Sequence, residues 1–216
     1  MKNKIVTISE LSAVPCKDNG EPIVNLKDIS PKIYLNYRRV NSGIDSILVR
    51  KSVADKLQKV QKQLELYDAQ MQLMVVEGYR PLAYQEKYYL KELLSQFQAN
   101  PSLDFDLLLE HTHQFVALPT LAGHPTGGAL DLTIAYSGEE LDMGGRIADF
   151  SSPQILPTYS NSITQEQAQR RILLHDLMVA EDFAPFYGEW WHFSYGDREW
   201  AAFYKKPEAI YSPIFT

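Results

Sequence analysis

The sequence predicts an α+β protein in which a small antiparallel sheet packs against several helices. Helical periodicity dominates the first half of the chain, whereas the strand-like segments gather around a glycine-rich centre. The chain has 216 residues with 45% hydrophobic and 22% charged side chains, the balance of one globular domain. A chain of this length buries roughly 70% of its unfolded surface, so it forms a core without disulfides. We therefore treat residues 1–216 as a single domain.

Apolar periodicity predicts three main helices. The first spans residues 51–71, where five apolar residues recur every three or four positions: Val53, Leu57, Val60, Leu64 and Tyr67. The second spans 82–98 and the third 165–178, which opens with a capping pattern at Ser162 or Thr164. We also expect a further short helix at residues 104–115.

Three segments are expected to be strands. A β-branched apolar run at 73–79 ends at a glycine and leads into a turn at Arg80-Pro81. Prolines and glycines exclude regular structure across 119–128, and a strand follows at 129–135. In that strand Asp131 lies on the face opposite the apolar one, so its carboxylate needs a partner. The last strand covers 189–195.

Charge and composition exclude several classes of function. The chain carries 21 Lys and Arg against 27 Asp and Glu, a net charge of −6, which leaves no basic surface for nucleic acid or an anionic membrane. No apolar run approaches the ~20 residues of a membrane span. Residues 1–10 lack the apolar core of a signal peptide, and the single cysteine, Cys16, excludes an internal disulfide. We expect a cytoplasmic protein, and nothing in the sequence specifies its oligomeric state.

Two of the five histidines occur in informative surroundings. His124 and Asp131 are seven residues apart, and the proline and glycines between them exclude a helix, so a tight loop must bring them together. Glu189 precedes His192 by three residues, and both reach one site only if Glu189 lies where the chain bends into the strand. His124, Asp131 and His192 are a donor set typical of catalytic zinc, which keeps an open position for water. The net charge near +1 lowers the pKa of such a water to about 7.

The remaining chemistry requires a base and a cation. We predict that Glu189 takes a proton from this water and returns it to the leaving amine. Arg80, fixed by the following proline, would stabilise the oxyanion of the tetrahedral intermediate. Simpler interpretations exist for each residue alone: Asp131 could cap a turn, and Arg80 could be a surface ion-pair partner.

The other candidate side chains are interpreted as structural. We assign His111, His113 and His175 to packing or the surface, and Trp190 and Trp191 to the core.

Three motifs in this order resemble the zinc D-alanyl-D-alanine dipeptidases of the VanX type, within the fold group of lysostaphin, D-Ala-D-Ala metallopeptidases and hedgehog. They are Gly78-Tyr79-Arg80-Pro81, His124 to Asp131, and Glu189-Trp190-Trp191-His192, and the likeness extends from about Tyr34 to Tyr204. The resemblance implies that His124, Asp131 and His192 hold one zinc ion, that Glu189 is the general base and that Arg80 stabilises the transition state.

Two positions depart from the pattern of this family. Ala122 stands where the family usually has serine, and Ala148 stands where it usually has an acid that holds the free amine of the substrate. Asp149 is adjacent and is the candidate to replace that acid. These departures leave zinc hydrolysis intact and bear on the dipeptide preferred.

The function expected from the sequence is zinc-dependent hydrolysis of D-Ala-D-Ala or a similar small dipeptide, in the recycling of cell-wall fragments or in resistance to agents that bind D-Ala-D-Ala. One alternative is a carboxypeptidase or endopeptidase acting on longer peptidoglycan stems. The other is a catalytically dead zinc-bearing binding protein, which the retention of Glu189 and Arg80 argues against.

Overall fold

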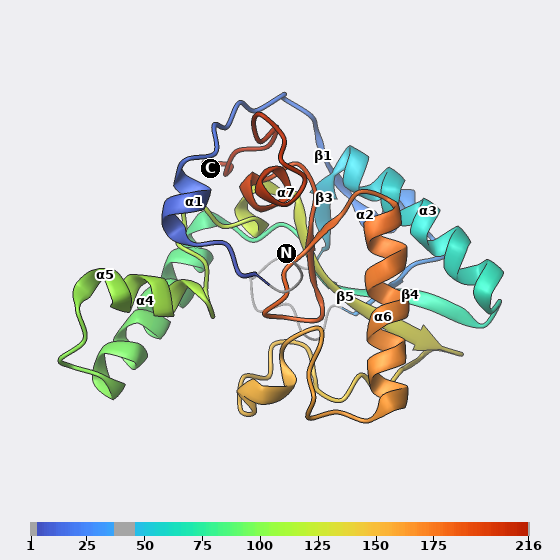
Figure 1. The fold of residues 1–216 in the computed structure, drawn as a ribbon. Helices are drawn as coiled ribbons and strands as arrows, with labels where there is room; N and C mark the ends of the chain where they lie inside the picture. Colours follow the sequence, from blue (N-terminus) through green and yellow to red (C-terminus); the bar gives the residue numbers. More distant parts are fainter. Residues whose placement is uncertain (1–3, 37–45, 216) are drawn as a thin grey trace.

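The computed structural model describes residues 4–36 and 46–215, so Met1–Asn3 of the N-terminal stretch considered above lie outside it. Figure 1 shows helices on both sides of a central sheet. The helices are α1 (Ile8–Ser12), α2 (Leu26–Ile29), α3 (Lys51–Tyr67), α4 (Leu82–Ala99), α5 (Phe105–His113), α6 (Gln165–Ala180) and α7 (Arg198–Phe203). The strands are β1 (Ile23–Asn25), β2 (Tyr34–Leu35), β3 (Leu48–Arg50), β4 (Met71–Glu77), β5 (Ala129–Tyr136), β6 (Glu139–Glu140), β7 (Ala184–Pro185) and β8 (His192–Ser194).

The central sheet has the order β2-β4-β5-β8-β7, with β6 paired to the far end of β5. Its pairs are antiparallel except β2 with β4, which run parallel, so the expected antiparallel sheet is in fact mixed. Strands β1 and β3 form a separate antiparallel pair. The α+β class is confirmed, and β5 is the strand that joins the two halves of the sheet.

The hydrophobic core lies between one face of the sheet and helices α3 and α6. Leu130, Leu132 and Ile134 of β5 are fully buried, as are Leu57 of α3 and Leu174 of α6. Figure 1 shows these two helices together on one side of the molecule. The alternation expected for β5 therefore places its apolar side chains in this layer and leaves Asp131 on the opposite face.

The opposite end of the molecule carries a helical hairpin of α4 and α5, which projects at the lower left of Figure 1. Its backbone leads into the irregular segment before His124. The chain also returns near its start, because Cys16 pairs with Ala209 in an isolated bridge. Within the described residues, no helix is both long and apolar enough to cross a membrane.

Several element boundaries differ from the sequence-based ones. The first long helix ends at Tyr67 rather than residue 71, because Asp68 leaves the helical conformation with φ −154° and ψ 122°. The strand expected at 73–79 is shifted to Met71–Glu77, and the last strand shrinks to three residues. The exclusion of regular structure across 119–128 was wrong for one turn, a 3₁₀ helix at His124–Thr126, whose Pro125 fits a first helical turn.

Candidate metal centre and active-site cavity

Three neighbouring strands present a row of polar side chains on the face away from the core. Glu77 of β4 pairs in register with Asp131 of β5, and Asp131 pairs with His192 of β8. Residues paired in this way across strands place their side chains side by side on the same face. Strand register alone therefore brings Glu77 beside Asp131, 54 positions later in the chain, and Asp131 beside His192, a further 61 positions later.

His124 reaches the same row from the 3₁₀ turn that precedes β5. The turn is ended by Gly127, whose φ of 72° is a left-handed conformation that glycine adopts without strain. Gly123 lies against Asp197, and a Cβ atom there would approach the Asp197 Oδ2 atom to 2.3 Å. The glycines of this segment are thus required by the backbone path that presents His124.

His124, Asp131 and His192 each offer a ligand atom, and these atoms all lie within 4.8 Å of one another. The Asp131 Oδ1 atom lies 3.4 Å from His124 Nε2 and 3.0 Å from His192 Nδ1. His124 Nδ1 lies 2.7 Å from the Gly78 carbonyl oxygen, to which it donates, so its Nε2 atom is left as a ligand. Two nitrogens and one carboxylate oxygen at a buried site fit a divalent metal such as zinc.

The charges of this site depend on one another. Burial raises the pKa of Asp131, but the two imidazoles lower it by more, so this carboxylate stays ionised. Burial lowers the pKa of His192, yet the hydrogen bond and the charge of Asp131 reverse this effect and raise that pKa to about 9. A buried carboxylate between two imidazoles is a site whose negative charge requires a cation, either a proton or a metal ion.

Glu189 lies just before β8, where the chain turns, and not within the strand. The His192 backbone N–H donates to the Glu189 carbonyl oxygen over 3.2 Å, which closes that turn. Glu189 and His192 line the same cavity. This agrees with the expectation that the two residues reach one site only if the chain bends at Glu189. Burial raises the pKa of the Glu189 carboxyl to about 8, with Asp131 adding to the shift and His192 and Arg80 opposing it. A pKa near neutrality suits a group that takes up and releases a proton.

Arg80 is largely buried, with a side chain that is 13% exposed, and is held by two side chains. Its Nε and Nη2 atoms each donate to a carboxylate oxygen of Glu77 over 2.7 Å, and Nη1 donates to Gln85 Oε1 over 2.7 Å. Its guanidinium lies over the Tyr88 ring at 5.3 Å. Arg80 is thus an ion-pair partner, but an internal one, whose charge is aimed into the cavity by Glu77 and Gln85. Burial opposes its charge, and Glu77 outweighs burial and raises its pKa.

All five predicted site residues line one cavity of about 380 Å³. This volume is within the range of small-molecule sites. Two walls can be distinguished. The catalytic wall is the strand row with His124, Arg80 and Glu189. We use the name facing wall for a second set of lining residues, namely Phe115, Ala122, Ala148 and Phe150 with Val6 and Leu11 of the N-terminal segment.

A sequence profile of the peptidase family described as D-Ala-D-Ala dipeptidase matches residues 38–210, most of the chain. The chain belongs to this family of peptidases. A curated D-alanyl-D-alanine dipeptidase of Synechocystis sp. is 29% identical over 218 residues, which cover 88% of this chain and 87% of that protein. The resemblance drawn from the three motifs is therefore confirmed at the level of the family.

Solved structures similar to this family member include the LdcB LD-carboxypeptidase, with a TM-score of 0.48, 19% identity, and coverage of 93% of this chain and 86% of that one. The D,D-pentapeptidase VanY in complex with Zn(II) has a TM-score of 0.43 and 15% identity, covering 93% and 96%. The D,D-dipeptidase VanXYg in complex with a D-Ala-D-Ala phosphinate analogue has a TM-score of 0.38 and 22% identity, covering 90% and 67%.

The polar residues of this cavity that sequence reasoning missed include Glu77, Gln85, His113 and Glu199. The sequence shows Glu77 three residues before Arg80. This spacing predicts an ion pair only once the end of the strand is known to lie at Glu77. His113 was assigned to packing or the surface; its side chain is buried, its Nδ1 accepts from the Leu118 N–H over 3.0 Å, and it also lines the cavity. His111 is exposed and His175 is buried outside the cavity, as that assignment allows.

The assignments of the tryptophans and of Asp149 have different outcomes. Trp190 and Trp191 are both 1% exposed, which confirms them as core residues, although Trp191 also borders the cavity. Asp149 is exposed, its Oδ1 atom accepts from the Ser151 N–H over 3.1 Å, and it is not among the residues that line the cavity. Ala148 does line it, with a φ of 57°. The structure thus gives no support to Asp149 as a partner for the amine of the substrate.

Proposed function

We propose that this peptidase hydrolyses D-Ala-D-Ala or a similar small dipeptide, with one zinc ion per chain held by His124, Asp131 and His192. The observation that carries the proposal is that these residues, Glu189 and Arg80 all border one cavity of about 380 Å³. A zinc ion bound there supplies a Lewis acid that polarises the scissile carbonyl and lowers the pKa of water. Membership in the dipeptidase family supports the choice of substrate.

The roles of the two other residues follow from their surroundings. Glu189 takes the proton of the attacking water and delivers it to the leaving amine, because its raised pKa allows both transfers. Arg80 places a fixed positive charge in the cavity, where it stabilises the oxyanion that develops on the substrate carbonyl. Glu77 and Gln85 keep this charge in position without reorganisation, since each contact to Arg80 is a 2.7 Å hydrogen bond.

A second candidate function is a carboxypeptidase acting on longer peptidoglycan stem peptides. The observation that favours it is the facing wall, where Ala122 and Ala148 present no charge for a free amine. A substrate whose amino group is already acylated needs no such charge. The two candidates share the metal site and Glu189, and they differ only in the length of peptide accepted.

The test is an assay of the zinc-loaded protein against D,D-, L,D- and L,L-dipeptides, beside tripeptides and N-acetylated dipeptides. We expect D-Ala-D-Ala to have the highest kcat/KM. The matched control is the zinc-loaded Glu189→Gln protein, which keeps the size of the side chain. Preference for acylated or longer peptides would favour the second candidate. Cleavage of no peptide above the level of the control would contradict both.

A further inference from the structure

Glu199 is a cavity residue to which neither the motifs nor the mechanism assign a role. It is the second residue of α7, whose start is fixed by Asp197, since the Asp197 Oδ1 atom accepts from the Trp200 N–H over 2.8 Å. Its side chain borders the cavity together with Glu189, His192 and Phe186. The carboxylate therefore lies beside the proposed reaction centre while belonging to a different element.

The other acids around the cavity have identified partners or roles. Glu77 is paired with Arg80, and Asp131 lies between the two ligand histidines. Glu92 accepts from Gln96 Nε2 over 2.8 Å. By contrast, the Glu199 side chain forms neither a hydrogen bond nor an ion pair with any of the described residues. Glu199 is the lining carboxylate whose charge is left for a ligand.

The surroundings of Glu199 favour a cationic ligand. Burial is the main influence on this carboxyl and raises its pKa to about 7, and His192 opposes the shift by its charge without a hydrogen bond between the two side chains. Val6, Leu11 and Phe186 add apolar surface to the lining. A carboxylate in a desolvated cavity is stabilised by a hydrogen-bonded cation. Glu199 is not one of the three clustered metal-ligating residues, so the cation is a separate one.

We propose that Glu199 binds the free ammonium group of the substrate, and so selects unblocked dipeptides. The inference rests on the proposed function, because a dipeptide is the substrate class whose ammonium comes within a few bonds of the scissile carbonyl. Glu199 also gives the cavity a negative charge. Ala148 has no charge, and Asp149 lies at the surface and does not line the cavity.

The test compares D-Ala-D-Ala with N-acetyl-D-Ala-D-Ala in the zinc-loaded protein and in Glu199→Gln, which keeps size and removes charge. We expect the parent to favour the free dipeptide by at least ~30-fold in kcat/KM, the lower end of the range for a buried charge pair. Glu199→Gln should lose this preference mainly through KM and leave cleavage of the acetylated dipeptide unchanged. Asp149→Asn, which neutralises an exposed acid, is the matched control and should behave as the parent.

A binding measurement separates this proposal from the proposed function. In the zinc-loaded Glu189→Gln background, calorimetry measures the affinity for each dipeptide without turnover. Adding Glu199→Gln should weaken binding of D-Ala-D-Ala by about 30-fold and spare the acetylated form. Equal affinities with and without Glu199 would overturn the ammonium site, whatever the parent cleaves. Loss of zinc from Glu199→Gln would also overturn it and make Glu199 a support for His192. Failure of the parent to cleave any dipeptide would contradict the proposed function instead.

Discussion

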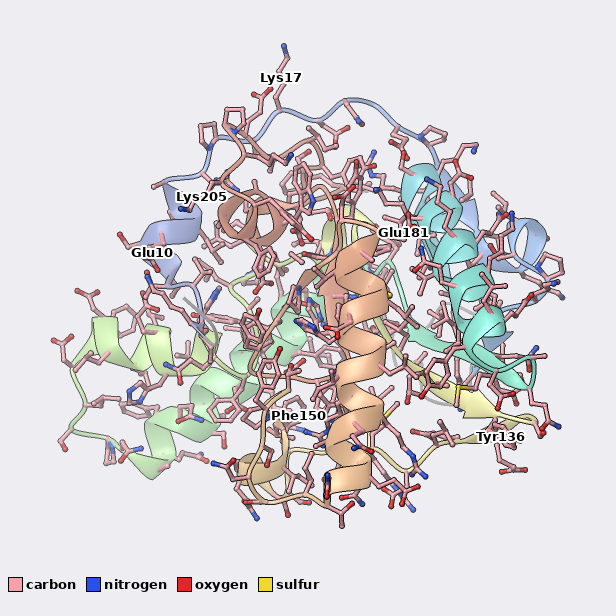
Figure 2. The ribbon with its side chains drawn as sticks, turned by 45° about the vertical axis from the view of Figure 1, so that its right-hand side comes forward. Glu10, Lys17, Tyr136, Phe150, Glu181 and Lys205 are labelled. Atoms are coloured by element: carbon pink, nitrogen blue, oxygen red, sulfur yellow. The ribbon has the colours of Figure 1, made fainter. Side chains whose placement is uncertain are left out.

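The two walls of the cavity are built in different ways. On the catalytic wall, Glu77, Asp131 and His192 are placed by the register of three hydrogen-bonded strands. On the facing wall, Ala148 and Phe150 lie on an irregular segment, on which Phe150 is labelled in Figure 2. A strand row cannot move one residue without disrupting its neighbours, whereas a loop changes its path at lower cost. The comparison teaches that the proposed metal ligands Asp131 and His192 lie on paired strands, whereas Ala148 and Phe150 lie on backbone that can vary at lower cost.

This segment with Ala148 and Phe150 is nevertheless held at both of its ends by one buried cation. Arg171 of α6 is 1% exposed, and it donates from Nε to the Met143 carbonyl over 2.7 Å. Its Nη1 atom donates to the carbonyls of Ile155 and Pro157 over 2.8 Å each. Both ends of the segment with Ala148 and Phe150 are thus tied to one guanidinium, which also lies over the Trp190 ring at 5.2 Å. The facing wall depends on side-chain contacts where the catalytic wall depends on backbone pairing.

The largest expected effect comes from removing a proposed metal ligand of the catalytic wall. His124→Ala and His192→Ala each leave two protein ligands, so tight zinc binding and peptidase activity should both be lost. Metal analysis after dialysis should find about one zinc per chain in the parent and far less in the variants. Full zinc occupancy in either variant would mean that His124, Asp131 and His192 are not the zinc ligands.

Next in size is the loss of the base. Glu189→Ala removes proton transfer but no proposed ligand, so the zinc content should stay at the level of the parent while kcat falls by at least ~10²-fold. Single-turnover kinetics and metal analysis on the same sample check both halves of this statement. Activity close to that of the parent would exclude Glu189 as the general base.

Arg80→Ala should lower kcat more than it raises KM, because a charge that faces the developing oxyanion acts mainly in the transition state. We expect a loss in kcat of roughly 10²-fold, the typical effect of removing one such donor. A change confined to KM would make Arg80 an anchor for the bound substrate. Gln85→Ala removes one of the groups that hold Arg80 and should give a smaller loss of the same kind.

The smallest effect on the reaction is expected on the facing wall. Arg171→Met leaves three carbonyl oxygens without their donor, so the free energy of unfolding should fall by about 3 kcal/mol. In the folded protein KM should rise several-fold while zinc content and kcat remain near those of the parent. Denaturant titration and steady-state kinetics measure the two effects. A fall in zinc content would show that the walls are not independent.

The residue types and order of the candidate site residues were predictable from the sequence. The glycines and proline between His124 and Asp131 excluded a helix, and Glu189 could serve the same site as His192 only at a bend. The structure has that bend before β8. Local backbone chemistry is sufficient for such statements, because they concern neighbours in the chain. The zinc ion and the role of Glu189 stay predictions.

Only the tertiary structure decided which distant groups accompany these residues. Glu77 became the partner of Arg80 through the end of β4, and Glu199 reached the cavity because α7 packs beside the sheet. Asp149, adjacent in sequence to the position of interest, lies at the surface, since Ala148 has a left-handed φ of 57° and the backbone turns there. Spacing along the chain determines which side chains share a turn or a strand face. Contacts between elements depend on how the hydrophobic core packs them, and that information is distributed over the whole sequence.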